Sequence, residues 1–369
     1  MTVRYRPELN AISPYQPGKP IADVQRELGL ERVIKLASNE NPLGFSPRVR
    51  EAVLQALEQA NFYPDGNATL LKEKIAEKYG VAPEMVLPTC GSDEMVDLIA
   101  KTFIEPGSQV IMAEVTFPRY LITSLMMGAD LQIVPMKDLG YDLGGFKEVL
   151  TPQTRLVWLC NPNNPTGSFF TRGELLDLLE SVSPETLVVY DEAYYEFATH
   201  PEYPRDSIEL VQKYPNMLVL RTLSKAYGLA GLRLGFTIGH PALLGLINRI
   251  RNPFNVTSLT QAAALAALDD EEFLARTVAN NNAGKEYLYG QLERLGLPYG
   301  KTEANHIMFD SRRDGQAVFQ ALLRRGVIIR PVGVPRYSTW LRVSIGTAEE
   351  NRVFIQALEE VLAELAPLS

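Results

Sequence analysis

The stretch that decides the fold is Met217-Leu-Val-Leu-Arg-Thr-Leu-Ser-Lys-Ala-Tyr-Gly-Leu-Ala-Gly-Leu-Arg-Leu-Gly-Phe-Thr-Ile238. It begins and ends in short apolar runs that are typical of buried strands. Between the runs lie Lys225, the hydroxyl residues Thr222 and Ser224, and Arg233. A lysine in apolar surroundings has a lowered pKa, and its neutral amine forms Schiff bases. Hydroxyl and guanidinium groups bind phosphate. A single lysine is more often a solvated loop residue, so the role of Lys225 depends on the rest of the chain.

Short apolar runs alternate with helical patterns from Val86 to about Ile238. The runs are VLPT, QVIMA, LQIVP, RLVWLC, TLVVYD, MLVLRT and FTIG. This alternation predicts an α/β fold in which a mainly parallel sheet is covered by helices on both faces, giving a large three-layer domain. The runs NHIMFD, GVIIRP and TWLRVSIG, with two helices, indicate a second, smaller α/β domain.

These patterns divide the chain into three parts. Residues 1–36 are rich in proline and predict an extended arm with one short helix near Ile21–Leu28, packed on the small domain or on a partner subunit. Residues 37–255 form the expected large domain, and residues 256–369 the small C-terminal domain.

Composition excludes several classes of function. A formal charge of −8 and a pI near 5.2 argue against nucleic acid or an anionic membrane as the main partner. The start of the chain lacks the apolar core of a signal peptide, and no apolar run approaches the roughly 18 residues of a membrane span. The two cysteines, Cys90 and Cys160, have no CxxC spacing, and the three histidines are scattered, so we expect no metal site. A cytoplasmic protein is expected.

Polar side chains follow several of the predicted strands, where ligands of parallel sheets bind. Gly91, Ser92 and Asp93 open a helix whose free backbone N–H groups attract phosphate, although such a start is commonly a simple cap. Phe117 is placed to stack on a flat ring, although phenylalanine more often belongs to a core.

Three more residues of this kind follow later strands. Asn164 lies in the rigid turn NPNNPTG, which aims its amide. Asp191, followed by Tyr194, ends an apolar strand, where a carboxylate needs a cation or a metal as partner. Together with Lys225, these groups fit a flat, phosphorylated, nitrogen-containing aldehyde, which is pyridoxal 5′-phosphate.

The motifs GSDE, NPNNPTG, DEAY, SKAYGLAGLR and LRVSIGT, in this order, resemble the fold-type I pyridoxal-phosphate aminotransferases over essentially the whole chain. The resemblance implies that Lys225 binds the cofactor covalently and later moves a proton between the substrate Cα and the cofactor C4′. Asp191 would pair with the pyridine nitrogen, and Tyr194 and Asn164 would donate to the phenolic oxygen. Phe117 would stack on the ring.

The resemblance also implies how the cofactor phosphate is held. Its ligands would be Gly91, Ser92, the backbone of Asp93, Thr222, Ser224, Arg233 and Tyr63. In the family the residue matching Tyr63 comes from a second subunit, so a homodimer with shared active sites is expected.

Within the family, RTLSKAYGLAGLRLGF and LASNENPLG resemble most strongly the members that transfer the amino group of L-histidinol phosphate to 2-oxoglutarate, in histidine biosynthesis. The resemblance implies that Arg342 and Arg330 hold the anionic groups of the substrates, that Asn164 contacts substrate, and that Tyr15 closes over it. The path of the proline-rich loop over residues 331–340 is not predictable.

The sequence leaves four other functions as alternatives, of unequal weight. An aromatic amino-acid aminotransferase would share the cofactor residues and differ in pocket shape. A pyridoxal-phosphate-dependent decarboxylase of a phosphorylated amino acid and a non-catalytic cofactor-binding protein are more distant alternatives. A dinucleotide-binding oxidoreductase is disfavoured because the glycines of GLAGLRLG do not form GxGxxG after the first strand.

Overall fold

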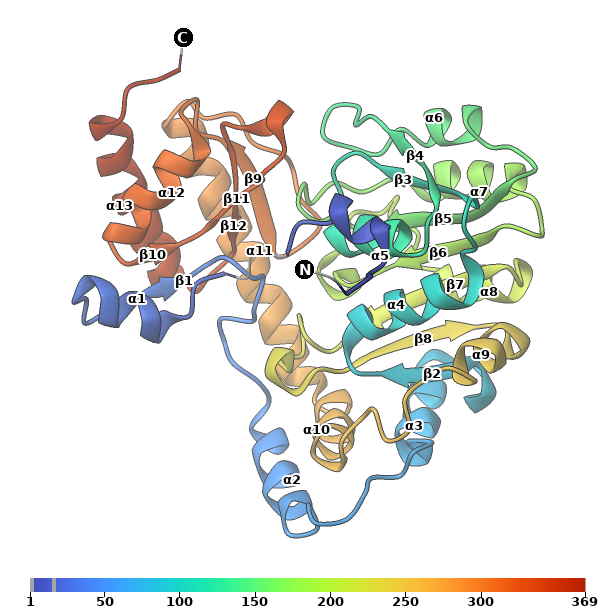
Figure 1. Cartoon of the computed structure of the whole chain (residues 1–369). Helices are drawn as coiled ribbons and strands as arrows, with labels where there is room; N and C mark the ends of the chain where they lie inside the picture. The colour runs from blue at the N-terminus through green and yellow to red at the C-terminus, as the bar shows by residue number, and fades with distance from the viewer. Residues whose placement is uncertain (1–2, 15–17, 369) are drawn as a thin grey trace.

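The computed structural model describes residues 3–14 and 18–368. Figure 1 shows two lobes, a larger one built on a seven-stranded sheet and a smaller one built on a three-stranded sheet. The long helix α11 (Glu271–Arg294) runs from the base of the larger lobe into the smaller lobe.

The large sheet contains all seven strands that the apolar runs predict. They are β2 (Val86–Thr89), β3 (Gln109–Ala113), β4 (Asp130–Val134), β5 (Thr154–Cys160), β6 (Leu187–Asp191), β7 (Met217–Thr222) and β8 (Gly235–Gly239). Their spatial order is β2-β8-β7-β6-β5-β3-β4, and β8 runs antiparallel to its two neighbours while the other pairs are parallel. The prediction of a mainly parallel sheet is therefore confirmed.

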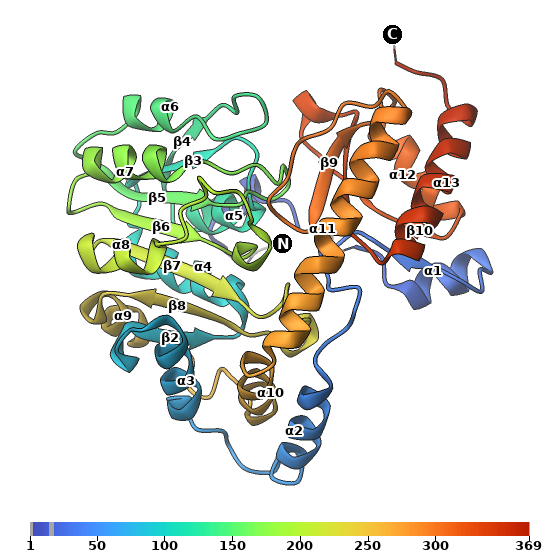
Figure 2. The ribbon, with the colours of Figure 1, turned by 180° about the vertical axis from the view of Figure 1, so that it is seen from behind.

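Helices cover both faces of this sheet. They are α4 (Gly91–Phe103), α5 (Pro118–Met126), α6 (Leu143–Glu148), α7 (Arg172–Ser181), α8 (Ser207–Lys213) and α9 (Pro241–Asn248). Helices α4 and α5 belong to connections that run across the sheet toward edge strand β4, whereas α6, α7 and α8 belong to connections that run from β4 back toward β7. Because such crossovers are right-handed, the two groups of helices lie on opposite faces of the sheet (Figures 1 and 2).

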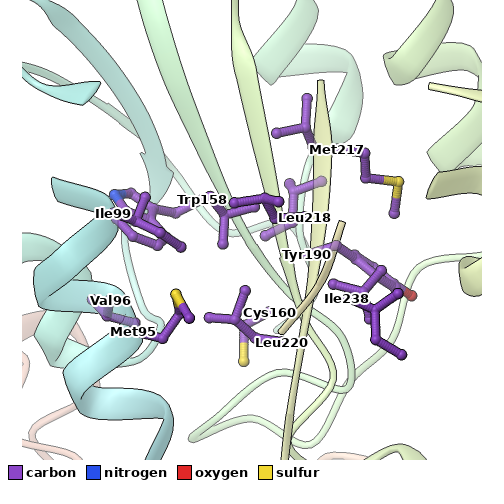
Figure 3. Packing of buried hydrophobic residues seen from close by; sticks show 14 of the residues in the cluster. Met95, Val96, Ile99, Trp158, Cys160, Tyr190, Met217, Leu218, Leu220 and Ile238 are labelled. Carbon is purple, nitrogen blue, oxygen red and sulfur yellow. The ribbon is translucent and has the colours of Figure 1, made fainter. Parts of the chain in front are cut away.

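The core lies where these helices meet the central strands. Every residue of β7 is buried, as expected for a strand covered on both sides. Figure 3 shows Met95 and Ile99 of α4 beside Trp158 of β5 and Leu218 of β7, all less than 1% exposed. This packing fixes the positions of the strand ends, which carry the polar residues.

The smaller lobe is built mainly from the C-terminal part of the chain. Its strands are β9 (His306–Asp310), β10 (Val327–Ile328), β11 (Arg330–Pro331) and β12 (Trp340–Ser344), and its helices are α12 (Gly315–Arg324) and α13 (Ala348–Glu364). The antiparallel sheet has the order β11-β12-β9. The three strands expected in this region are thus found, with GVIIRP divided between β10 and β11.

The N-terminal segment contacts both lobes. The short 3₁₀ helix η1 (Pro7–Ala11) lies against α5, and the helix expected near residues 21–28 is α1 (Ile21–Leu28). Strand β1 (Ile34–Lys35) pairs in parallel with β10, so the end of the segment extends the small lobe. The division of the chain at residues 36 and 255 stays a prediction.

Three helices form the lower part of the molecule in Figure 1: α2 (Pro47–Leu57), α3 (Thr69–Tyr79) and α10 (Ser258–Leu268). α10 packs on α2 and α3, and its buried residues belong to the same core as the seven-stranded sheet. The remaining short 3₁₀ helices are η2 (Pro83–Met85), η3 (Tyr195–Phe197), η4 (Ala230–Leu232) and η5 (Pro335–Tyr337).

Candidate active site

The polar strand ends converge on one cavity of about 680 Å³ at the carboxyl edge of the large sheet. Because β8 is antiparallel to β7, Thr222 at the end of β7 lies opposite Gly235 at the start of β8. The loop that carries Lys225 therefore returns to the same edge with Arg233. The cavity is lined by Ser92, Asp93, Phe117, Cys160, Asn164, Asp191, Ala193, Tyr194, Thr222, Ser224, Lys225 and Arg233.

Lys225 lies in the wall of this cavity with its amine close to Tyr194. Its Nζ donates to the carbonyl oxygen of Ser38 over 3.1 Å and lies 5.8 Å from the centre of the Tyr194 ring. Burial, together with the positive charge of Arg342, lowers the pKa of Lys225 to about 8. A substantial fraction of the amine is therefore neutral and nucleophilic near neutral pH.

Asp191 is a buried carboxylate, 2% exposed, at the end of β6. It accepts hydrogen bonds from the Tyr120 hydroxyl over 2.7 Å and from the Ala193 backbone N–H over 3.0 Å. Burial outweighs these bonds and raises the pKa of Asp191 to about 6. A cationic N–H placed in the cavity against Asp191 would keep the carboxyl ionised.

An anion cradle lies at the N-terminus of α4. Gly91 begins the helix with φ +74°, and Arg233 reaches over it to Asp93, 3.1 Å from Nη2 to Oδ2, and to the Ser224 hydroxyl, 3.3 Å from Nη1. A Cβ on Gly91 would lie 2.4 Å from Arg233 Nη2. Only glycine leaves room for the guanidinium here, and backbone N–H groups at a helix start attract anions.

Two further residues that the sequence suggests as phosphate ligands, Thr222 and Tyr63, lie in different surroundings from this helix start. The Thr222 hydroxyl lines the cavity but donates to the Leu234 carbonyl over 3.0 Å. Tyr63 lies outside this cavity, is 82% exposed and stacks on Phe254 at 4.6 Å. Tyr15 lies outside the described residues.

The NPNNPTG turn directs one asparagine at the cavity, and its other two asparagines anchor the turn to neighbouring segments. The Asn161 amide donates to the Tyr190 hydroxyl over 2.8 Å, and the Asn163 amide donates to the Val115 carbonyl over 2.9 Å. Asn164 lines the cavity, and its Oδ1 accepts from Nη1 of Arg342 over 2.5 Å.

A second cavity of about 960 Å³ adjoins the first and shares Phe117 and Asn164 with it. Arg330 and Arg342 both line the second cavity, where they are direct partners on antiparallel β11 and β12. Its walls include the apolar residues Leu121, Ile133, Val332 and Val334. The cavity therefore combines two cations with an apolar surface.

The structure also gives the course of the loop that the sequence left open. Val332 and Val334 line the second cavity, and η5 follows directly. Arg336 in η5 forms an ion pair with Glu114, 3.3 Å from Nη1 to Oε2, just beyond β3. The loop thus forms a wall of the cavity against the large lobe.

Three residues of the site were missed in the sequence. Tyr120 donates a hydrogen bond to Asp191. The only feature of the sequence that indicates a role in the site is its position three residues, or one helical turn, after Phe117. Asn39, in LASNENPLG, donates to the Tyr194 hydroxyl over 2.8 Å. Its amide also lies 3.0 Å from Nδ1 of His306, a histidine without any local motif.

No helix among the described residues is long and apolar enough to cross a membrane. Within residues 3–14 and 18–368, no group of three or more His, Cys, Asp or Glu side chains is arranged to hold a metal ion.

A lysine with a lowered pKa, a buried acid and an anion cradle at the carboxyl edge of such a sheet define an α/β enzyme built to act on an anionic ligand through a reactive amine. Comparison with known families is more specific. The family model for aminotransferase class I and II matches residues 31–358, and the chain belongs to this family.

Similar proteins cover nearly the whole chain. The chain is 47% identical to histidinol-phosphate aminotransferase 2 of Carboxydothermus hydrogenoformans, covering 97% of this chain and 99% of the relative. It is 45% identical to histidinol-phosphate aminotransferase of Caldicellulosiruptor saccharolyticus, covering 97% and 100%. Among solved structures, histidinol-phosphate aminotransferase from Sinorhizobium meliloti in complex with pyridoxal 5′-phosphate superposes with a TM-score of 0.91, at 28% identity and 99% coverage of both chains.

Proposed function

We propose that this protein is a pyridoxal-phosphate-dependent aminotransferase that converts L-histidinol phosphate and 2-oxoglutarate to imidazole-acetol phosphate and L-glutamate. The observation that carries the substrate assignment is the pair Arg330 and Arg342, which face one cavity that adjoins the cavity of Lys225. The names of the relatives support the same assignment.

The residues of the first cavity fit pyridoxal phosphate. The helix start at Gly91 with Ser92, Ser224 and Arg233 suits a phosphate, and a Cβ on Gly235 would come within 2.6 Å of the Ser92 nitrogen, so both glycines keep the cradle open. When bound, the cofactor supplies an electron sink that makes the substrate Cα–H acidic.

Lys225 would bind the cofactor covalently and then act as the proton carrier. Its lowered pKa would provide the neutral amine that binding to an aldehyde requires. Once displaced by the amino substrate, the same amine would take the proton from the substrate Cα and return one at the cofactor C4′. The Ser38 carbonyl, which accepts from Nζ, keeps the amine in this wall of the cavity.

Other side chains would orient and polarise the ring. Asp191 would hold a proton on the pyridine nitrogen, since burial strengthens a charge-assisted bond. Tyr194 and Asn164 would donate to the phenolic oxygen. Phe117, which lines both cavities, would stack on one face of the ring.

The second cavity would bind the substrates in turn. Two guanidinium groups suit either the phosphate of histidinol phosphate or a carboxylate of 2-oxoglutarate. The apolar wall with Leu121 and Ile133 would take the imidazole ring.

A homodimer is part of this proposal. Leu54 and Leu57 of α2, Phe62 and Tyr63 after it, and Leu70 of α3 are all more than half exposed. Exposed apolar side chains on α2, α3 and the segment between them suggest that this part of the protein surface is an interface. A second subunit on this surface would cover it and bring Tyr63 to the neighbouring phosphate cradle. A cytoplasmic location belongs to the same proposal, and two free cysteines suit a reducing compartment.

A comparison of substrates tests the assignment. We expect kcat/KM with 2-oxoglutarate as acceptor to be higher for histidinol phosphate than for phenylalanine. A preference for phenylalanine would favour an aromatic aminotransferase, and release of carbon dioxide from a phosphorylated amino acid without transamination would indicate the decarboxylase.

A further inference from the structure

Asn39 is held in one conformation by the small lobe. It is 1% exposed and adopts a left-handed backbone with φ 56°. Its N–H donates to the Ser344 hydroxyl over 2.8 Å, and its carbonyl accepts from the Asn305 amide over 3.0 Å. Because both backbone groups are bonded, the direction of the Asn39 side chain is fixed.

The hydrogen bonds of the Asn39 amide define which way it faces. Its Oδ1 accepts from the Ser344 hydroxyl over 3.0 Å, so Nδ2 faces Tyr194 and His306. An amide nitrogen only donates. The Tyr194 oxygen therefore accepts from Asn39, and the hydroxyl hydrogen of Tyr194 remains for a group in the cavity that Tyr194 lines.

His306 selects this orientation of the amide. It is fully buried, and its ring meets the Tyr194 ring edge-on with centroids 5.0 Å apart. Burial and the positive charges of Arg342 and Lys225 hold the pKa of His306 well below its usual range, against the opposing effect of the nearby backbone of Asn163 and Pro165. We assign the hydrogen of the neutral ring to Nε2, which leaves Nδ1 as an acceptor 3.0 Å from Asn39 Nδ2. In this tautomer a flipped amide would bring two acceptors together.

We propose that Asn39 and His306 are positioning residues that turn the hydroxyl hydrogen of Tyr194 toward the phenolic oxygen of the cofactor. This inference rests on the cofactor role proposed for Tyr194. It adds a link between the lobes, since His306 begins β9 and Ser344 ends β12 in the small lobe, whereas Tyr194 follows β6 in the large lobe. The strength of the hydrogen bond that Tyr194 donates to the cofactor thus depends on the position of the small sheet relative to the large lobe.

The proposal makes a spectroscopic prediction. A hydrogen bond donated to the phenolic oxygen favours its anionic form, so losing that bond raises the pH midpoint of the visible absorbance of the lysine-bound cofactor. We expect Tyr194→Phe to raise this midpoint by about one pH unit, the size of a lost bond to a charged group. Asn39→Asp should raise it similarly, because a carboxylate would draw the Tyr194 hydrogen to itself.

Two substitutions at residue 306 separate positioning from packing. His306→Phe keeps an aromatic ring against Tyr194 but removes the acceptor, so the midpoint should rise, and the melting temperature should fall because a buried N–H of Asn39 loses its partner. His306→Asn retains an acceptor at the position of Nδ1 but leaves a void, so the midpoint should stay near that of the wild type while the melting temperature falls.

The matched control is Asn351→Asp, a fully buried amide whose hydrogen bonds go to the backbone of Gly346. It should lower the melting temperature without moving the midpoint. A shift in Tyr194→Phe without one in Asn39→Asp overturns the proposal, and so does the absence of both shifts. The titration requires no amino substrate, so a wrong substrate assignment would leave its result valid.

Discussion

Arg330 and Arg342 are opposite each other on antiparallel strands β11 and β12, and both face the same cavity. Arg342 is the more deeply buried of the two, with 8% of its surface exposed, whereas Arg330 is only partly buried. Arg342 also donates hydrogen bonds to Asn164 and to the Ala37 carbonyl. Arg342 therefore lies nearer the cofactor residues, and Arg330 nearer the outer part of the cavity.

This arrangement predicts a selective effect of Arg330→Ala. Loss of one charge-assisted hydrogen bond, about 1.5–3 kcal/mol, should lower kcat/KM for histidinol phosphate roughly 10- to 100-fold. The loss for phenylalanine, which has no phosphate, should be clearly smaller. Arg325→Ala, which removes an arginine paired with Glu360 and Glu364 on the small lobe, is the control and should change neither value much. Equal losses for both substrates would remove Arg330 from phosphate recognition.

The lowered pKa of Lys225 predicts how fast the cofactor-free protein binds pyridoxal phosphate. The neutral fraction of the amine rises about tenfold per pH unit below its pKa and levels off above about pH 8. The rate at which visible absorbance appears after mixing should follow the same curve between pH 6 and 9.

Lys225→Ala should show no such absorbance and no turnover at any pH. Lys285→Ala, which removes another buried lysine, one that contacts the Thr302 carbonyl and Glu303, should retain the absorbance. A rate that keeps rising to pH 10 would contradict the lowered pKa of Lys225.

The raised pKa of Asp191 predicts that this residue destabilises the cofactor-free protein at neutral pH. The folded pKa of about 6 exceeds the ordinary aspartate pKa of 3.8, so folding favours the protonated acid, and the advantage is lost as the pH rises through 6. At pH 8, Asp191→Asn should therefore increase the free energy of unfolding relative to wild type by about 2 kcal/mol more than at pH 4.

Urea unfolding of both cofactor-free proteins at pH 4 and pH 8 measures this difference. The same substitution should reduce transamination severely, because a neutral amide does not hold a proton on the pyridine nitrogen. If the difference in stability between the two proteins does not depend on pH, the carboxyl of Asp191 titrates in its ordinary range.

Mixed dimers test whether Tyr63 serves the other subunit. Tyr63→Ala homodimers should bind cofactor weakly, and Lys225→Ala homodimers should be inactive. In a heterodimer of the two, the subunit with an intact Lys225 receives an intact Tyr63 from its neighbour. Activity at limiting cofactor should therefore reappear when the two variants are unfolded together and refolded. No recovery in heterodimers that have formed would mean that the sites are not shared in this way.

Local sequence patterns sufficed for the strands and for the residues at their ends. Most of the runs from VLPT to FTIG are largely apolar because both faces of the central strands are covered, and each polar residue that follows a run lies at the carboxyl edge by the geometry of parallel strands. Asp191, Asn164 and Lys225 could therefore be expected to meet. Tyr63 and Tyr15 could not be judged in this way, since one lies outside the cavity and the other outside the described residues.

The tertiary structure alone decided how these groups are tuned and what shape the substrate cavity takes. Asn39 and Tyr194 are 155 residues apart in sequence, and Asn39 and His306 are 267 apart, so no local pattern indicates their hydrogen bonds. The loop after Arg330 likewise contacts a distant segment, through the ion pair of Arg336 with Glu114. Sequence by itself determined which chemical groups the sheet presents, because periodicity and strand direction are local. Burial, hydrogen-bond direction and pKa depend on distant segments, which only the folded chain brings together.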